Sequence, residues 1–244
     1  MKTCVVIGAG VVGLTTAVVL QKQGWKVTIV ARATPRQFDW NDETYASPKA
    51  GAHWCPNLFD SDSKHREYEA ETFKVLCSLV AKHPFIMFAP SKLFLAQKPQ
   101  EWRMPWFADL VKDFKLVDAV ELPPQHLFGF QYTTTCINVP QYLEWLVTEF
   151  ERQGGQFEIR TVQHINELFG RWNVVINCSG LGSKTLGGVE DDSMYPIRGQ
   201  IAVIPYKADF AALSERTEME ETQYIIPRPD GTTIIGGTFA KHRS

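Results

Sequence analysis

A glycine-spaced turn near the amino terminus places the strongest constraint on the fold of this chain. The run VVIGAGVVGLTTA, residues 5–17, begins with β-branched residues and ends in an apolar segment typical of a helix. Gly8, Gly10 and Gly13 have the GxGxxG spacing that permits a tight turn, close approach of the backbone to a pyrophosphate, and close helix–strand packing. In such a turn the phosphates face the amino-terminal end of the helix. The motif therefore predicts a dinucleotide-binding site.

The residues after this turn complete one βαβ unit. Gly24 stands where a glycine commonly ends a helix, and residues 25–30 are typical of a second β-strand. An acidic residue that binds a ribose hydroxyl is expected at the end of that strand, but Arg32 is found there instead. Arg32 alone favours a 2′-phosphate and hence NADP, whereas the motif by itself is compatible with NAD, NADP or FAD.

Composition and charge exclude several other classes of protein. With 244 residues, 44% of them hydrophobic, the chain can bury a substantial core in one large domain or two small ones. A net charge of -2 without blocks of like charge gives no electrostatic footprint for nucleic acid or an anionic membrane. No apolar run approaches the roughly 20 residues of a membrane span. We therefore expect a soluble intracellular protein that acts on small molecules.

The five cysteines are odd in number, widely spaced and without a CxxC pair. This pattern argues against a disulfide framework and against a zinc site, so we expect no metal centre. It also favours a reducing compartment.

Turn signals and hydrophobic periodicity divide the rest of the chain into expected elements. Helices are expected over residues 64–82, 107–114 and 139–153. Strands are expected over residues 85–97 (one or two), 157–162, 173–178 and 199–205, with a hairpin of 224–227 and 232–235 around Asp230 and Gly231. The pattern predicts an α/β fold in which a Rossmann-like, doubly wound domain accompanies a second, mainly antiparallel sheet.

Five motifs, in order along the whole chain, resemble the FAD-dependent D-amino-acid oxidases and D-aspartate oxidases. They are VVIGAGVVGLTTA at 5–17, YASPKAGAHWCP at 45–56, VINCSGLGSKTLGG at 175–188, PIRGQ at 196–200 and YIIPRPDG at 224–231. The resemblance implies FAD as the cofactor. It further implies a discontinuous FAD-binding domain from 1–53 and 135–192, and a substrate and interface domain from 54–134 and 193–244.

The resemblance also implies roles for individual residues. Those implied to hold the FAD pyrophosphate are Gly8, Ala9, Gly10, Val12 and Gly13. Those implied to contact the rest of the cofactor are Arg32 by the adenosine half, Ser47, Gly51, Ala52 and His53 in a loop, Val162 at the adenine or ribose end, and Ser179 with Gly180. Tyr224 is implied to donate its hydroxyl to the substrate carboxylate. Ordinary packing remains an alternative role for His53, Val162 and Tyr224.

The implied reaction is oxidative deamination of a D-amino acid by FAD and molecular oxygen, which yields a 2-oxo acid, ammonia and hydrogen peroxide. Orientation of the substrate is then more important than a general base. The resemblance implies a peroxisomal or cytoplasmic location, and a homodimer is one assembly that it allows. No nucleic-acid or membrane partner is expected.

Members of that family extend well beyond the last of these motifs, with a carboxylate-binding arginine and a glycine-rich turn at the flavin ring. We therefore expect the 244-residue chain by itself to show little or no oxidase activity. Three alternatives remain open: a D-aspartate oxidase, an NADP-dependent reductase that uses Arg32, and a non-catalytic module that only binds flavin.

Overall fold

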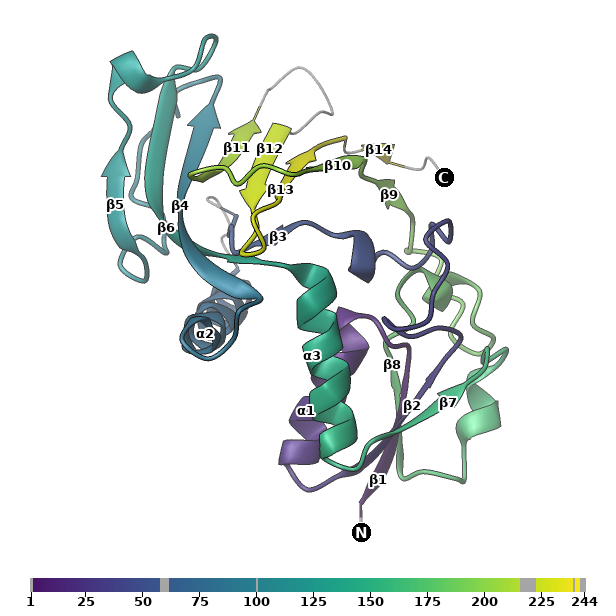
Figure 1. Ribbon diagram of the computed structural model, residues 1–244. Coiled ribbons are helices and arrows are strands. Elements are labelled where there is room, and N and C mark those ends of the chain that lie inside the picture. The colour runs from purple at the N-terminus through teal and green to yellow at the C-terminus, as the bar shows by residue number, and fades with distance from the viewer. Residues whose placement is uncertain (1, 58–61, 100, 216–222, 239, 242–244) are drawn as a thin grey trace. The chain divides into compact units, whose positions relative to one another are not determined.

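The computed structural model describes residues 2–57, 62–99, 101–215, 223–238 and 240–241 (Figure 1). Its contacts divide the chain into two compact units. The first unit comprises residues 1–50, 139–196 and 241–244, and the second comprises residues 51–138 and 197–240. Each unit is therefore built from segments that are far apart in the sequence.

The first unit contains a parallel sheet of four strands in the order β7-β2-β1-β8. Its elements are β1 (Thr3–Ile7), α1 (Val11–Lys22), β2 (Lys26–Ala31), α3 (Val139–Arg152), β7 (Gln156–Ile159) and β8 (Val174–Asn177). Because β1 lies between β2 and β8, the amino-terminal strand occupies the middle of the sheet (Figure 1). This arrangement confirms the expected Rossmann-like sheet.

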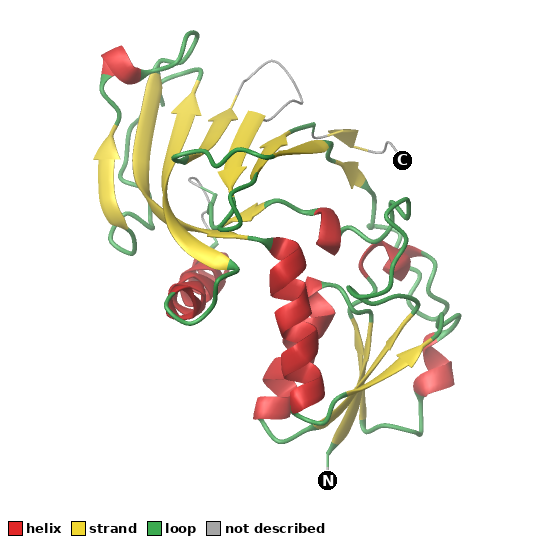
Figure 2. Ribbon diagram, in the orientation of Figure 1, coloured by secondary structure: helices red, strands yellow, loops and turns green. Residues whose placement is uncertain are grey.

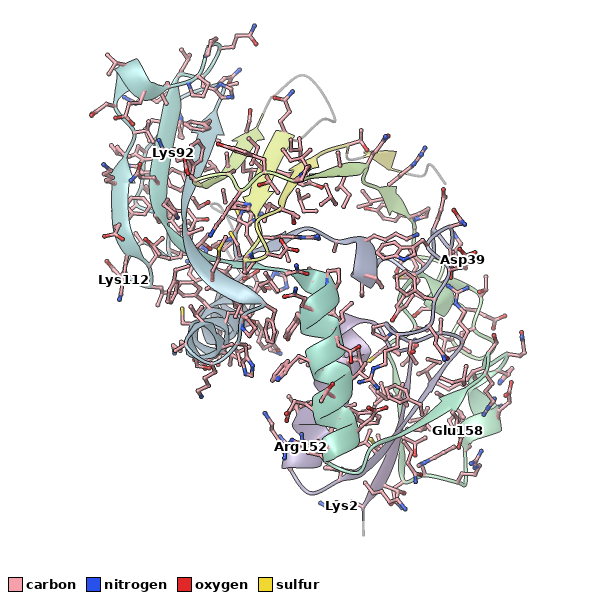
Figure 3. All side chains as sticks on the ribbon, in the orientation of Figure 1. Lys2, Asp39, Lys92, Lys112, Arg152 and Glu158 are labelled. Atoms are coloured by element: carbon pink, nitrogen blue, oxygen red, sulfur yellow. The ribbon has the colours of Figure 1, made fainter. Side chains whose placement is uncertain are left out.

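Helices α1 and α3 pack side by side in this unit (Figure 2). In α3, Leu143, Leu146, Val147 and Phe150 are buried at the i, i+3, i+4, i+7 spacing of an amphipathic helix. The helix ends at Arg152, which forms an ion pair of 2.8 Å with Glu149 (Figure 3). The apolar stripe of α3 thus explains how a segment distant from α1 in the sequence joins the same unit.

One face of the parallel sheet is covered by short turns. Val5, Ile7 and Val30 form a buried cluster with Leu168 and Leu186. The short 3₁₀ helices of this unit are η1 (Ser47–Lys49), η3 (Ile165–Leu168) and η4 (Gly180–Lys184).

The second unit is built on a sheet of eight strands. Seven of them are paired in the order β10-β13-β12-β11-β4-β6-β3, and the eighth, β5, also pairs with β6. Its elements are β3 (Ala52–His53), α2 (Ser63–Val80), β4 (Ile86–Leu95), β5 (Lys112–Leu116), η2 (Ala119–Glu121), β6 (Phe128–Ile137), β10 (Ile201–Ile204), β11 (Ala211–Glu215), β12 (Gln223–Pro227) and β13 (Thr233–Gly236). The β4–β11 pair is parallel, and the other described pairs are antiparallel. Strands β9 (Ile197–Arg198) and β14 (Ala240–Lys241) form a separate pair.

Aromatic side chains dominate the core of this sheet. Trp54 stacks on Phe73 of α2 with ring centroids 4.2 Å apart, and Phe107, Phe130 and Tyr132 complete the buried cluster. Such rings bury large apolar areas, so this cluster holds α2 and the 105–110 turn against β4 and β6.

Two expectations about local structure are wrong. The expected helix over 107–114 is absent: Lys112 (Figure 3) begins β5, and the Thr133 hydroxyl of β6 donates a 2.7 Å hydrogen bond to the Asp113 carboxylate. The strand expected over 157–162 ends at Ile159, which leaves Val162 in a loop. Cross-strand pairing thus overrides local periodicity around residue 112.

Candidate functional site

The glycine turn between β1 and α1 contains two glycines that the fold itself requires. Gly8 has a φ of +104°, which L side chains rarely adopt, and a Cβ there would lie 3.0 Å from the carbonyl carbon of Cys178. A Cβ at Gly13 would lie 3.0 Å from the carbonyl carbon of Gly8. Both positions meet rigid backbone, so Gly8 and Gly13 permit the close packing of β1, β8 and α1.

Gly10 has no comparable structural explanation. Its φ of -74° is open to any residue, and a Cβ there would meet only the Ser47 side chain, with Oγ at 3.0 Å. Gly10 is the amino-terminal cap of α1, where no side chain caps the helix and no acidic residue occupies the first turn. Helix amino termini attract anions through their free N–H groups and the helix dipole. The turn therefore fits a pyrophosphate that approaches the backbone at Gly10.

Two hydrogen bonds connect the glycine turn to the loop that contains Tyr45 and Ser47. The Tyr45 hydroxyl donates to the Ala9 carbonyl at 2.8 Å, and the Val11 N–H donates to Ser47 Oγ at 3.0 Å. Burial raises the pKa of Tyr45, so its hydroxyl stays protonated as a donor. Ser47 thus lies at the start of α1 beside Gly10, while Val12 is exposed there.

A second turn leaves β8 next to the glycine turn. Parallel pairing of β1 with β8 continues into a 2.9 Å hydrogen bond from the Cys178 N–H to the Ile7 carbonyl. The Asn177 side-chain oxygen then accepts from the N–H (3.1 Å) and hydroxyl (2.7 Å) of Ser179. Gly180 has a φ of +58° with open space around its Cβ position. Both turns follow the carboxyl ends of adjacent parallel strands, where doubly wound sheets bind ligands.

Arg32 directly follows β2 and is already paired within the first unit. Its guanidinium lies 2.6 Å from the Asp42 carboxylate and also donates to the Thr44 hydroxyl. Hydrogen bonds from Thr44, together with the charge of Arg32, lower the pKa of Asp42. Asp42 is not among the residues predicted from the sequence, although an Asp two residues before a Thr is a recognisable turn-forming pattern. A 2′-phosphate at Arg32 would have to compete with this carboxylate.

The position of Val162 is consistent with a role in hydrophobic packing. Its side chain is partly buried against the cluster that contains Leu168 and Leu186.

His53 and its neighbours belong to the second unit. In β3, Ala52 pairs with Ile137 and His53 with Cys136 of β6. Gly51 is closely packed, because a Cβ there would lie 3.0 Å from the side chain of Ile234.

The His53 imidazole is the most strongly perturbed histidine among the described residues. Its Nε2 atom is buried without a hydrogen-bond partner among the described residues, and burial lowers the pKa of His53 to about 4. A neutral imidazole with a vacant hydrogen-bonding nitrogen fits a residue that meets a polar ligand group.

Tyr224 lies in β12 of the antiparallel hairpin, opposite Gly236 of β13. Its ring is partly buried, and burial raises the pKa of the phenol above its ordinary value. The hydroxyl is therefore protonated at neutral pH and can donate to a carboxylate. Arg228, farther along the same hairpin, is only 7% exposed.

The predicted residues divide between the two units. The glycine turn, Ser47, Ser179 and Gly180 come together in the first unit, with Arg32 at the end of β2 and Val162 in a loop. Gly51, Ala52, His53 and Tyr224 lie in the second unit. Among the described residues, no group of three or more His, Cys, Asp or Glu side chains is placed to hold a metal ion. No helix within the described ranges is long and apolar enough to cross a membrane.

Comparisons with known proteins identify the family to which the chain belongs. Residues 3–244 match the family described as FAD dependent oxidoreductase. The chain is 32% identical to a D-amino-acid oxidase of Schizosaccharomyces pombe, over 97% of this chain and 69% of the relative. It is 30% identical to a D-aspartate oxidase of Talaromyces thermophilus, over 96% of this chain and 70% of the relative. The chain thus spans about 70% of the length of such relatives.

Solved structures show the same fold. A glycine oxidase from Geobacillus kaustophilus superposes with a TM-score of 0.74 at 15% identity, over 100% of this chain and 73% of that structure. The family match over nearly the whole sequence, together with relatives above 30% identity, identifies the chain as a member of the FAD-dependent oxidoreductase family.

Proposed function

We propose that the protein, with FAD bound, oxidises D-amino acids to 2-oxo acids with release of ammonia and hydrogen peroxide. Relatives of this chain that carry the name D-amino-acid oxidase support the substrate class. The cofactor assignment rests on Gly10. Neither its φ nor contact with neighbouring backbone requires glycine there, whereas a bound pyrophosphate would need the space that a side chain would fill.

The residues of the first unit provide the cofactor cradle. N–H groups at the start of α1 would hold the pyrophosphate of FAD, and Gly10 would leave room for it beside the backbone. Ser47 holds the Val11 N–H and fixes the loop beside the turn. FAD, when bound, supplies the electron-accepting chemistry that no side chain can provide.

Tyr224 supplies a donor for the substrate in the second unit. Its protonated hydroxyl donates a hydrogen bond to the carboxylate of the amino acid, which limits rotation of the substrate and so orients its α-carbon. A charge-assisted hydrogen bond of this kind is roughly twice as strong as one between neutral groups.

A peroxide-coupled assay tests the proposal. Turnover by purified, FAD-supplemented protein, which we expect to be low for residues 1–244 alone, should be seen with D-alanine or D-methionine and not with L-alanine, which is the matched control. Higher turnover with D-aspartate would identify the alternative, a D-aspartate oxidase. Equal turnover of both alanine enantiomers, or a protein that does not bind FAD, would contradict the proposal.

The absorbance spectrum of the bound cofactor tests the remaining alternatives. Flavin bands in the purified protein support FAD, whereas nicotinamide absorbance would support an NADP-dependent reductase. Flavin bands without turnover of any D-amino acid would support a module that only binds flavin.

Several sequence-based expectations extend this proposal. We propose a peroxisomal or cytoplasmic location, with a homodimer as one possible assembly. The expectation that residues 1–244 alone have little oxidase activity also stays a prediction, which the same assay measures. Fractionation of the native cells and light scattering of the purified protein test location and assembly.

A further inference from the structure

Two consecutive glycines lie directly under the ring of Tyr224. Strands β12 and β13 are antiparallel neighbours (Figure 1), and Tyr224 pairs with Gly236. A Cβ at Gly236 would lie 2.5 Å from the tyrosine hydroxyl oxygen and 2.6 Å from Cε2. A Cβ at Gly237 would lie 2.8 Å from Cε1 and 3.0 Å from the same hydroxyl oxygen. Any side chain at either position would therefore occupy the space of the phenol.

A left-handed backbone is not the reason for glycine at these positions. Neither Gly236 nor Gly237 has a φ in the left-handed region that favours glycine. Glycine also weakens a strand, because it has no side chain to pack. The three atoms that would lie nearest to a Cβ at either position all belong to Tyr224. The tyrosine ring is therefore the contact that a side chain at either position would meet first.

We propose that Gly236 and Gly237 position the Tyr224 hydroxyl for the substrate carboxylate, an inference that rests on the proposed function. The phenol approaches two residues that lack side chains, and Tyr224 packs against the cluster that contains Ala89, Ile226 and Ile234. The hydroxyl is the far end of the side chain and approaches both glycines. A methyl group at either position would therefore displace the donor while leaving the strand backbone in place.

Fluorine NMR can measure this displacement without turnover. The chain has seven tyrosines, and the Tyr224 signal of 3-fluorotyrosine-labelled protein is the one that Tyr224→Phe removes. Gly236→Ala should shift this signal more than Gly237→Ala, because its Cβ overlaps the ring more deeply. Gly199→Ala is the matched control, since its Cβ would make only an ordinary 3.5 Å contact with the Thr238 carbonyl oxygen. An unmoved Tyr224 signal in both variants would overturn the proposal.

Binding of propionate to the FAD-loaded protein tests the consequence for a carboxylate ligand. Propionate is D-alanine without its amino group, so it binds without reacting. Gly236→Ala and Tyr224→Phe should each raise the Kd of propionate by about tenfold, as expected for loss of one charge-assisted hydrogen bond. The double variant should be no weaker than either single variant, because both changes remove the same contact.

Other outcomes have distinct meanings. The proposal would be overturned if the fold-increases in the propionate Kd multiplied in the double variant. It would also be overturned if Gly236→Ala lowered the melting temperature but left the propionate Kd unchanged, because the glycines would then have a purely structural role. If Gly236→Ala does not fold, Gly237→Ala decides, because it places a smaller overlap on the ring. Unmutated protein that turns over both alanine enantiomers equally would contradict the proposed function, whereas the fluorine signals would still test the positioning role.

Discussion

Acidification should destabilise the second unit through His53. Burial lowers the pKa of His53 in the folded protein to about 4, from 6.5 when the side chain is exposed. Between these two values the unfolded chain binds a proton that the folded chain does not bind. The free energy of unfolding therefore rises with pH across this window, and the contribution of His53 is lost as the pH falls from 6.5 towards 4.

The size of the effect follows from the two pKa values. The interval between about 4 and 6.5 corresponds to about 3 kcal/mol, at 1.36 kcal/mol for each pKa unit. Most of this loss has occurred by about pH 5, where the free energy of unfolding is about 2 kcal/mol lower than at neutral pH. That is a large fraction of the stability of an ordinary domain.

Urea unfolding across this pH range, compared with His53→Asn, isolates the contribution of one imidazole. Fluorescence of the chain's tryptophans follows the transition, because Trp54 is next to His53 and is buried in the aromatic core. The unmutated protein should lose about 2 kcal/mol more than His53→Asn between neutral pH and about pH 5, because asparagine does not titrate there. A difference between the two proteins that stays constant with pH would refute the reasoning.

Further predictions concern the cofactor cradle, the substrate donor and the core. Gly10→Val should abolish FAD binding, because a branched side chain would occupy the space of the pyrophosphate; an unchanged FAD titration would contradict this assignment. In a version of the enzyme that also carries the carboxylate-binding arginine of the family, Tyr224→Phe should raise the apparent KM for D-alanine by about tenfold, which steady-state kinetics measures, and an unchanged KM would leave Tyr224 only a packing role. Leu146→Ala should cost about 2–5 kcal/mol in urea unfolding, because this side chain of α3 is buried; a cost near zero would mean that the helix packs loosely.

The sequence predicted best what depends on neighbouring residues. The glycine turn, its βαβ unit and the hairpin around Asp230 were predicted because turn residues and strand patterns lie within one short window. Strand β5 was missed because its partner, β6, lies outside any such window. Its pairing, and not its own periodicity, determines its conformation.

The same distinction applies to the candidate site. The motif spacing identified Gly8, Gly10 and Gly13 together, but only the structure separates Gly8 and Gly13, where a Cβ would meet backbone, from Gly10, where it would meet only the Ser47 side chain. The ion pair of Arg32 with Asp42 could not be predicted from strand patterns, because the carboxylate comes from a loop. A local pattern names the residues of a site more readily than it names their partners.

The central position of β1 determines the order in which the first unit can form during synthesis. β1 pairs with β2 soon after both leave the ribosome, but its other neighbour, β8, begins at Val174. Residues 51–138, which belong to the second unit, are made in between. During that interval one side of β1 has unpaired N–H and C=O groups beside the apolar residues Val5 and Val6. Such an edge pairs readily with other chains. Newly made copies are therefore most exposed to aggregation until residue 177 has emerged, and a chaperone that covers β1 would act in that interval.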